Sequence, residues 1–287
     1  MNIGPYKLIA LETGCFALDG GAMFGVVPKN LWVRKNPADD ANRIDLALRT
    51  LLLISDEKKI LIDTGIGEKF SEKWQKIYKI DHSRQSLLSS LKAYSVSPDQ
   101  ITDVILTHLH FDHCGGTTFR ENDSTLLRFP NATYHIQKEQ WQWANEPSEK
   151  DHASFLPENF AILKDSAKLN LINGSLKLFP GIETLVMYGH TPGMQLLKIS
   201  DHNQTVLYCS DLIPTASHIA VPWVMAYDNY PLKTIAEKVN ILPGAVSENW
   251  LLFFEHDLAR AAGFVKENEK GYELKQEFST SEFNNLK

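Results

Sequence analysis

The chain has 287 residues, of which 43% are hydrophobic and 22% charged, an ordinary composition for a globular protein. Its net charge of −6 and the absence of a basic run argue against a nucleic-acid partner. The sequence shows no leader at its N-terminus and no apolar run of membrane-spanning length, so we expect a cytoplasmic protein that does not engage a membrane. Its three cysteines, Cys15, Cys114 and Cys209, are too few for a disulfide framework and are expected to be small buried side chains.

The first part of the chain is predicted to consist mainly of β-strands. Tyr6–Glu12 and Leu31–Lys35 are short runs of β-forming residues. Ile44–Ser55 and Lys59–Asp63 flank a short polar turn, which predicts a hairpin whose second strand ends at an aspartate.

The rest of the chain is predicted to mix helices and strands. The predicted helices cover 68–78, 86–94, 138–145 and 231–241. The predicted strands cover 101–107, 132–137, 167–172, 176–179, 183–188, 195–200, 205–209 and 251–255. Residues 146–160 are polar and contain two prolines, so we expect them to cross the surface. No linker or repeat interrupts the pattern, which predicts one α/β domain over residues 1–287.

The strongest chemical signal is the run His108-Leu109-His110-Phe111-Asp112-His113, which directly follows the predicted strand 101–107. Alternation along an extended segment would place His108, His110 and Asp112 on one side. A turn after Asp112 would then bring His113 to the same cavity. A lone histidine in a loop is more often a satisfied polar group, but this register favours a metal site. Imidazole and carboxylate ligands suit Zn²⁺ or another borderline first-row ion better than Ca²⁺ or Mg²⁺.

This run resembles the signature of the metallo-β-lactamase superfamily. The family's other landmarks are matched in order by Asp63 at a strand end, His190 in a Gly-His-Thr-Pro-Gly run, Asp211 at another strand end, and His256. The resemblance spans residues 63–256. It implies an αββα four-layer sandwich, in which two mixed β-sheets lie face to face with helices outside and the metals lie at one end.

The resemblance also implies a role for each matched residue. One divalent ion would be held by His108, His110 and His190, a second by Asp112, His113 and His256, and both would be bridged by Asp211. Asp63 would orient a metal-binding histidine. Zinc is the expected metal, with manganese, iron and cobalt as alternatives.

A dinuclear centre of this kind implies hydrolysis. Two cations lower the pKa of a shared water, so that a bridging hydroxide attacks the substrate at neutral pH. A metal would stabilise the oxyanion that forms, and Asp112 is placed to carry a proton to the leaving group.

Within the superfamily, the layout is most similar to N-acyl homoserine lactone lactonases and to the related organophosphate hydrolases. Those lactonases have a tyrosine three residues after the bridging aspartate, where this chain has Pro214. His218 is the preferred substitute for that tyrosine, with Tyr227 and Tyr230 as alternatives. A satisfied or surface position for His218 is at least as compatible with the sequence.

Two apolar segments are candidates for the walls of a substrate pocket. A mobile lip for an acyl or aromatic group is expected from Met23, Phe24 and Val26, unless the first two simply pack in the core. Trp223 and Tyr227 would form the opposite wall, or alternatively a homodimer contact.

The leading prediction is a hydrolase that acts on a small-molecule lactone or carboxylic ester of the N-acyl homoserine lactone type. Organophosphate triesters and aryl esters are the main alternative substrates, followed by β-lactams and thioesters. A non-enzymatic metal-stabilised scaffold is the weakest alternative, because all seven predicted ligands are present. The unmatched residues His82, His135, His152 and His202 are expected to be solvated or capping side chains.

Overall fold

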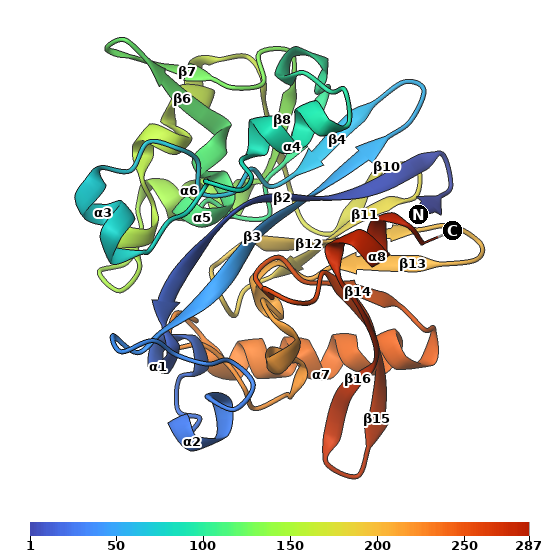
Figure 1. Cartoon of the computed structure of the whole chain (residues 1–287). Coiled ribbons are helices and arrows are strands. Elements are labelled where there is room, and N and C mark those ends of the chain that lie inside the picture. The colour runs from blue at the N-terminus through green and yellow to red at the C-terminus, as the bar shows by residue number, and fades with distance from the viewer. Residues whose placement is uncertain (287) are drawn as a thin grey trace.

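Two seven-stranded β-sheets face each other in the computed structural model, which describes residues 1–286 (Figure 1). The first sheet contains, in spatial order, β1 (Asn2–Ile3), β2 (Tyr6–Asp19), β3 (Arg43–Ile54), β4 (Lys59–Ile62), β5 (Asp103–Ile105), β8 (Thr133–Gln137) and β9 (Leu169–Ile172). The second contains β10 (Leu176–Phe179), β11 (Ile182–Met187), β12 (Met194–Ser200), β13 (Thr205–Tyr208), β14 (Leu251–Phe253), β15 (Ala262–Asn268) and β16 (Gly271–Phe278). A separate hairpin pairs β6 (Thr118–Glu121) with β7 (Ser124–Leu127).

Both large sheets are mixed. The pairs β4–β5, β5–β8, β8–β9 and β13–β14 are parallel, and the other neighbours are antiparallel. The α-helices are α1 (Gly20–Phe24), α2 (Lys29–Trp32), α3 (Glu72–Ile77), α4 (Leu87–Ala93), α5 (Phe111–Cys114), α6 (Lys138–Asn145), α7 (Pro231–Ser247) and α8 (Thr280–Asn284). Short 3₁₀ turns are η1 (Pro98–Gln100), η2 (Gly115–Thr117), η3 (His152–Ser154), η4 (Pro157–Asn159), η5 (Ala161–Asp165), η6 (Ser210–Leu212) and η7 (Ala216–Ile219).

The central strand β3 shows how the layers are packed. Leu51 and Leu53 lie between the two sheets, in one cluster with Leu197 of β12. Leu52 points to the other face of its sheet and packs in the cluster that contains Leu91 of α4. Because both faces of this part of β3 are covered, its last four residues, Leu51–Ile54, form a continuous apolar run rather than an alternating one.

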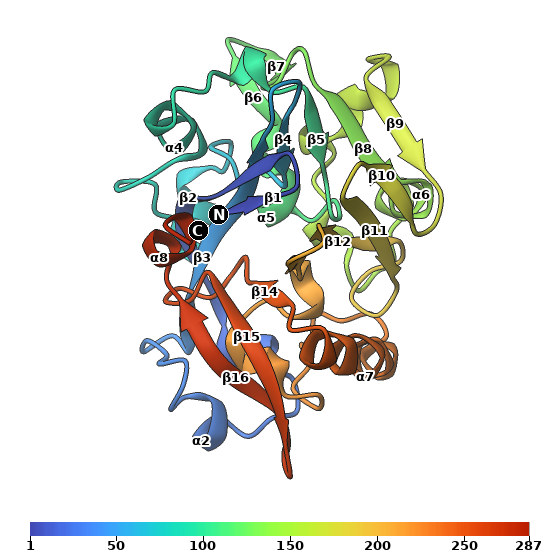
Figure 2. The ribbon, with the colours of Figure 1, turned by 90° about the vertical axis from the view of Figure 1, so that its right-hand side faces the viewer.

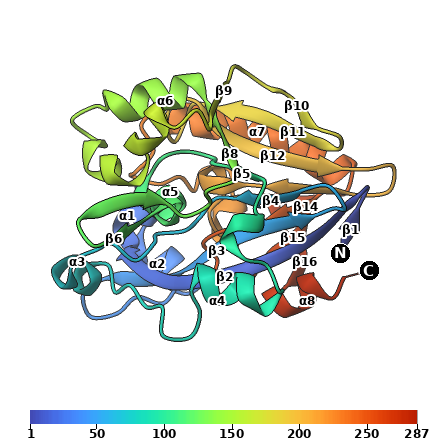
Figure 3. The same cartoon turned by 90° about the horizontal axis from the view of Figure 1, so that it is seen from above.

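Helices cover the outer faces of the sandwich. Viewed from above, α4 lies on one side of the molecule and α7 on the other (Figure 3), whereas Phe283 of α8 packs in the cluster between the sheets. Leu242 and Ala245 of α7 pack in one cluster with Leu207 and Leu252 of the second sheet. Figure 2 shows α7 beside β14 of this sheet. This is the αββα sandwich that the sequence predicts.

Among residues 1–286, no helix combines the length and apolar character needed to cross a membrane.

One prediction for the N-terminal region is wrong. The range Leu31–Lys35, predicted as a strand, contains the end of α2 and the turn after it. The helix begins directly after Pro28, and its Trp32 is buried with its ring stacked 5.3 Å from that of Phe24. The segment expected to form a lip contains the short helix α1, which begins after Asp19, whose carboxylate accepts a hydrogen bond from the amide of Ala22 at 2.9 Å.

Candidate metal centre

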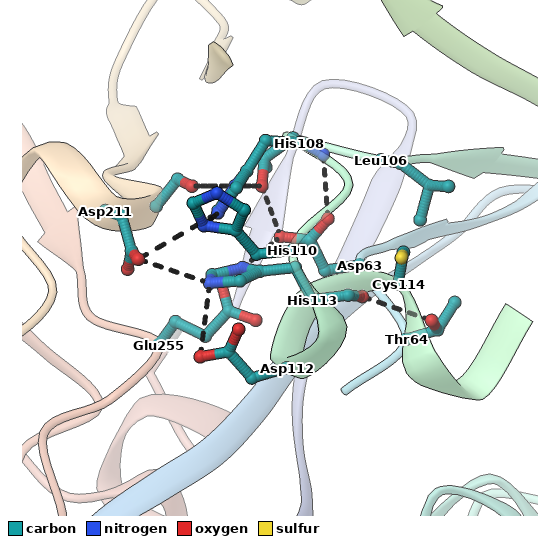
Figure 4. Close-up of polar contacts among 12 residues, drawn as sticks. Asp63, Thr64, Leu106, His108, His110, Asp112, His113, Cys114, Asp211 and Glu255 are labelled. Carbon is teal, nitrogen blue, oxygen red and sulfur yellow. Dashed lines mark hydrogen bonds and ion pairs between the residues drawn. The ribbon is translucent and has the colours of Figure 1, made fainter. Parts of the chain in front are cut away.

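Strands of both sheets end on the same side of the sandwich, and the predicted site residues follow these ends. β4 leads to Asp63 and β5 to His108, while β11, β13 and β14 lead to His190, Asp211 and His256. The close-up in Figure 4 shows the side chains of Asp211, His108 and His113 pointing toward one another. Residues separated by more than a hundred positions therefore meet at one edge of the fold.

Two groups of buried side chains converge at this edge, with ligand atoms within 4.8 Å of one another in each group. The first group is His108, His110, His190 and Asp211, and the second is Asp112, His113 and His256. These are the seven side chains that the sequence singles out as ligands. The structure brings all of them together in the two sets expected.

In the first group, three imidazoles turn one nitrogen each toward a common point. Nδ1 of His110 lies 3.1 Å from Nε2 of His108 and 3.1 Å from Nε2 of His190. Oδ2 of Asp211 lies 3.2 Å from Nε2 of His190 and 3.9 Å from Nε2 of His108.

The second group adjoins the first through Asp211. Nε2 of His113 and Nε2 of His256 are 3.2 Å apart, and Oδ2 of Asp112 lies 3.8 Å and 3.7 Å from them, respectively. Oδ1 of Asp211 lies 3.4 Å from Nε2 of His256, while its Oδ2 lies 3.4 Å from Nε2 of His113. The Asp211 carboxylate thus stands between both groups, as a bridging ligand would.

The far side of each of two histidines is held by a backbone or carboxylate oxygen. Nδ1 of His190 lies 2.9 Å from Oδ1 of Asp228, and Nδ1 of His256 lies 2.9 Å from the carbonyl oxygen of Ala47. An acceptor at Nδ1 places the proton there and leaves Nε2 as a lone-pair donor toward the centre.

His113 is held by two carboxylates at once. Its Nδ1 lies 3.3 Å from Oδ2 of Asp63 and 3.1 Å from Oε2 of Glu255. Asp63 also accepts hydrogen bonds from the amide and hydroxyl of Thr107, both at 2.7 Å. Asp63 has a φ of 56°, a left-handed backbone conformation that an aspartate tolerates better than most residues. The structure therefore places Asp63 where it orients a histidine of the centre.

Close backbone packing fixes the position of the histidine-rich segment. An added Cβ at Gly115 would lie 2.0 Å from the carbonyl oxygen of Ile66, and one at Gly116 would lie 2.2 Å from that of Thr64. No larger residue fits at either position without backbone movement. The sequence predicts a turn after Asp112, and this is wrong. The helical turn α5 begins at Phe111, so the chain already turns before Asp112.

Burial and mutual repulsion disfavour the charged forms of His108 and His110 in the first group. Burial, with the neighbouring imidazoles, lowers the pKa of His108 and of His110 well below the usual value. Burial alone would raise the pKa of Asp211, but His113 and His190 hold it well below its usual range. Neutral imidazoles and an ionised carboxylate are the protonation states that metal binding requires.

The second group lies in a more negative environment. Burial acts to lower the pKa of His113, but the carboxylates of Glu255, Asp211 and Asp112 raise it well above its usual value. Burial likewise opposes the charged form of His256, but Asp211 raises its pKa to about 9. These carboxylates attract positive charge, so protons and a metal ion compete for the same nitrogens.

The donor set fits divalent metal ions. Imidazole nitrogens face one another at close range, which is favourable when a cation shares their lone pairs. Oδ1 of Asp211 is buried and finds no hydrogen-bond partner among residues 1–286. Buried polar atoms without a partner are rare and costly, and a metal ion would satisfy this one.

A cavity of about 200 Å³ opens onto this centre. Its polar floor includes His110, Asp112, His190, Asp211 and His256. Its other walls are mostly apolar or aromatic and include Phe16, Leu18, Met23, Leu46, Tyr78, Phe111, Met225 and Tyr227. A larger open groove of about 1190 Å³ lies beside β6 and β7, but it is lined by none of the predicted ligands. We therefore take the smaller cavity as the candidate substrate site.

Two of the five predicted pocket residues, Met23 and Tyr227, line this cavity. The other three do not. Phe24 is fully buried in the core, Val26 is 90% exposed, and Trp223 packs edge-on against Phe24. Of the three residues of the expected lip, Phe24 is thus core, Met23 lines the cavity and Val26 is exposed.

His218 is wrongly predicted as the substitute for the lactonase tyrosine. Its ring is buried and stacked 4.8 Å from that of Phe24. Its Nε2 lies 2.8 Å from the carbonyl oxygen of Met23 and its Nδ1 lies 2.8 Å from Oγ1 of Thr215. With both nitrogens occupied and no place on the cavity wall, His218 supports the fold of η7 instead. Tyr230 is also outside the cavity, whereas Tyr227 is part of it.

Several residues of the site gave no usable signal in the sequence. Glu255 and Asp228 are buried carboxylates that hold His113 and His190, and Lys150 reaches the cavity from the segment 146–160. Only the position of Glu255, directly before His256, could have indicated a role.

His135, expected to be solvated or capping, is buried and pairs with Asp103 at 2.9 Å. Cys15 is only half-buried, unlike Cys114 and Cys209.

Comparisons with known proteins agree with this geometry. The family model of the metallo-β-lactamase superfamily matches residues 49–247. An N-acyl homoserine lactonase from Bacillus sp is 26% identical over 234 residues, which cover 77% of this chain and 85% of that protein.

Solved structures give the same result over almost the whole length. A probable metal-dependent hydrolase from Staphylococcus aureus superposes with a TM-score of 0.88 at 30% identity, covering 97% of this chain and 98% of the other. AidC, a dizinc quorum-quenching lactonase in complex with a product, superposes with a TM-score of 0.80 at 25% identity, covering 97% and 96%. The chain therefore belongs to the metallo-β-lactamase superfamily, and its fold and homologues are those of metal-dependent hydrolases.

Proposed function

We propose that this chain is a dinuclear metal-dependent hydrolase of a lactone or carboxylic ester. The single observation that supports it most is the position of Asp211 between two groups of ligands at the floor of a largely apolar cavity. The similarity to N-acyl homoserine lactonases makes an acyl homoserine lactone the first substrate to test.

The proposed ligands are those of the two groups described above, with Asp211 shared between them. Two bound divalent ions would supply a water of lowered pKa and a positive charge opposite the substrate oxygen. Zinc is our proposed metal, because imidazole and carboxylate donors suit it and because AidC is a dizinc protein. Manganese, iron and cobalt accept the same ligands.

We assign Tyr227 the role of the missing lactonase tyrosine. It lines the cavity, and no hydrogen bond of its hydroxyl is found among residues 1–286. Burial, with Tyr78 and Asp112 nearby, raises the pKa of Tyr227 well above its usual value. The hydroxyl therefore stays protonated at neutral pH and can donate a hydrogen bond to a carbonyl oxygen that becomes negative.

Asp112 is our candidate for proton transfer to the leaving group. It is 8% exposed and lies on the cavity floor, so one side of its carboxylate is open to a bound substrate. A carboxylate in this position can accept a proton from the attacking water and pass it to the departing oxygen.

The size and lining of the cavity favour a compact substrate with an apolar arm. About 200 Å³ is small for a ligand site, and Phe16, Met23 and Met225 offer a wall without charge. An acyl chain would bury its methylene groups against this wall, each worth roughly 0.8 kcal/mol.

The experiment is a panel assay of the metal-loaded protein. Acyl homoserine lactones of increasing chain length, aryl esters, a phosphotriester, a chromogenic cephalosporin and a glutathione thioester are compared by kcat/KM. We expect the lactones or carboxylic esters to be the best substrates. Preference for the phosphotriester, the cephalosporin or the thioester would contradict the proposal, and so would inactivity on the whole panel.

Dimerisation and the cytoplasmic location stay predictions of the sequence.

A further inference from the structure

Lys150 brings a positive charge to the rim of the cavity. It lies between α6 and η3 in the polar segment 146–160, and it is exposed to solvent while also lining the cavity. Its Nζ donates a hydrogen bond of 2.9 Å to the carbonyl oxygen of Tyr227. No other lysine and no arginine is among the described residues that line this cavity.

The ammonium group of Lys150 has no ion-pair partner among residues 1–286 within 4.0 Å. The nearest carboxylates that act on it are those of Asp228 and Asp151. Both are engaged elsewhere: Asp228 holds Nδ1 of His190 at 2.9 Å, and Asp151 accepts a 2.8 Å hydrogen bond from Trp143.

An ammonium group has three N–H donors, and the Tyr227 carbonyl uses only one. The remaining donors can therefore act on a group that enters the cavity. Lysine side chains at a solvent-exposed position normally lie free in water, so the fixed hydrogen bond to the cavity wall indicates a positioned charge.

We propose that Lys150 binds a negatively charged group of the substrate, so that the preferred ester or lactone carries an anionic group, such as a carboxylate, remote from the bond that is cleaved. This inference rests on the proposed function and narrows its substrate class. The scissile carbonyl would lie over the metal centre, the apolar arm along Phe16 and Met23, and the anionic end at the rim. A charge-assisted hydrogen bond of this kind favours the charged substrate over a neutral one of the same shape.

The first test compares two esters of equal length, one ending in a carboxylate and the other in a methyl group. For the wild type we expect the anionic ester to have a kcat/KM about tenfold higher, mainly through a lower KM, with the advantage falling at high ionic strength. Lys150→Met should lower kcat/KM for the anionic ester about tenfold more than for the neutral ester, while Lys150→Arg should retain part of the advantage. The control is Lys266→Met, at a surface lysine that is 52% exposed and pairs with Glu273 on the β15–β16 hairpin.

A binding measurement separates this inference from the hydrolytic function. Monocarboxylates of increasing length and the dicarboxylates of the same length are titrated calorimetrically into the metal-loaded protein. We expect one dicarboxylate to bind about tenfold tighter than its monocarboxylate, and Lys150→Met to remove the difference. If no ester reacts but the dicarboxylate still binds more tightly than the monocarboxylate, the proposed hydrolase function is rejected. The proposed anion site at Lys150 is then retained.

Two results would overturn the inference. The first is an equal loss for both esters in Lys150→Met, which would mean that Lys150 only supports the Tyr227 backbone. The second is the same affinity for mono- and dicarboxylates at every length in the wild type.

Discussion

The carboxylate of Asp228 lies 2.9 Å from Nδ1 of His190 and also accepts a 3.2 Å hydrogen bond from the amide of Met225. One buried side chain therefore links a proposed metal ligand to the wall of the substrate cavity. Asp228 is 2% exposed, so it acts without screening by water. Its position explains how the loop after η7 and the metal centre keep a fixed geometry relative to each other.

Replacing Asp228 should weaken metal binding without removing a ligand. In Asp228→Ala, Nδ1 of His190 loses its acceptor, so the ring is free to rotate and its Nε2 becomes a poorer donor. We expect metal affinity to fall by about 10- to 100-fold, as is typical for partners that orient a ligand. The measurement is competition against a chelator of known affinity. The control is Asp45→Ala, at a surface aspartate that is 49% exposed. Equal metal affinity in the Asp228→Ala and Asp45→Ala variants would contradict the role of Asp228 in orienting His190.

The hydroxyl of Tyr227 should act mainly on kcat. Tyr227→Phe removes the proposed donor to the carbonyl oxygen and keeps the aromatic wall. Loss of one donor of this type costs roughly 100-fold in kcat. The matched control is Tyr230→Phe, because Tyr230 is 48% exposed and lies outside the cavity. Steady-state kinetics in which both variants behave like the wild type would remove Tyr227 from the mechanism.

Asp103 should make the fold sensitive to acid. Burial opposes its charge, but hydrogen bonds from His135, Lys58 and Thr102 lower the pKa of Asp103 to about 2. Asp103 has a higher pKa in the unfolded chain than in the folded one, so on acidification the unfolded chain takes up the proton first. The stability that this carboxylate contributes is therefore present above pH 4 and is lost as the pH falls toward 2. The loss should amount to about 2 kcal/mol.

Denaturant unfolding of the wild type and of Asp103→Asn from pH 5 to low pH tests this. The variant should be less stable at pH 5 and should lose less on acidification. Asp123→Asn, at an exposed turn residue between β6 and β7, should follow the wild type. Parallel curves for wild type and Asp103→Asn would show that the carboxylate of Asp103 is not stabilised in the fold.

Lys238 of α7 should also make stability rise with pH, but in the alkaline range. Its amine is fully buried and donates to the carbonyl oxygens of Ala220 and Trp223 at 2.9 and 2.8 Å. Burial lowers the pKa of Lys238 to about 7. Above this pH the unfolded chain still binds the proton and the folded chain does not, so the free energy of unfolding rises with pH.

The comparison is between the wild type and Lys238→Met at pH 7 and pH 9. The wild type should gain about 2 kcal/mol relative to the variant over this range. A difference between the two proteins that does not change with pH would mean that the amine stays charged in the folded state.

The candidate ligands could be proposed from the sequence because the run from His108 to His113 is specific by its spacing. The resemblance to the superfamily then pointed to His190, Asp211 and His256, which also follow the ends of strands. The hairpin of β3 and β4 was equally clear, since a polar turn separates two apolar runs.

The walls of the cavity could not be predicted, because they depend on tertiary packing. Phe24 and Met23 are neighbours with the same apolar character, yet Phe24 packs in the core and Met23 faces the cavity. His218 looked available in the sequence, but two hydrogen bonds and a stacked ring occupy it. The sequence also predicts no element after His256, because β15 and β16 carry exposed polar residues that weaken the strand pattern.

Metal analysis of the purified protein, combined with titration of the metal-free form, tests the central claim most directly. The wild type should bind two divalent ions per chain, His113→Ala should bind fewer in the second group, and Asp211→Ala should weaken both sites. A wild-type protein that saturates with one ion, or that binds none, would contradict the dinuclear centre on which the proposed hydrolysis depends.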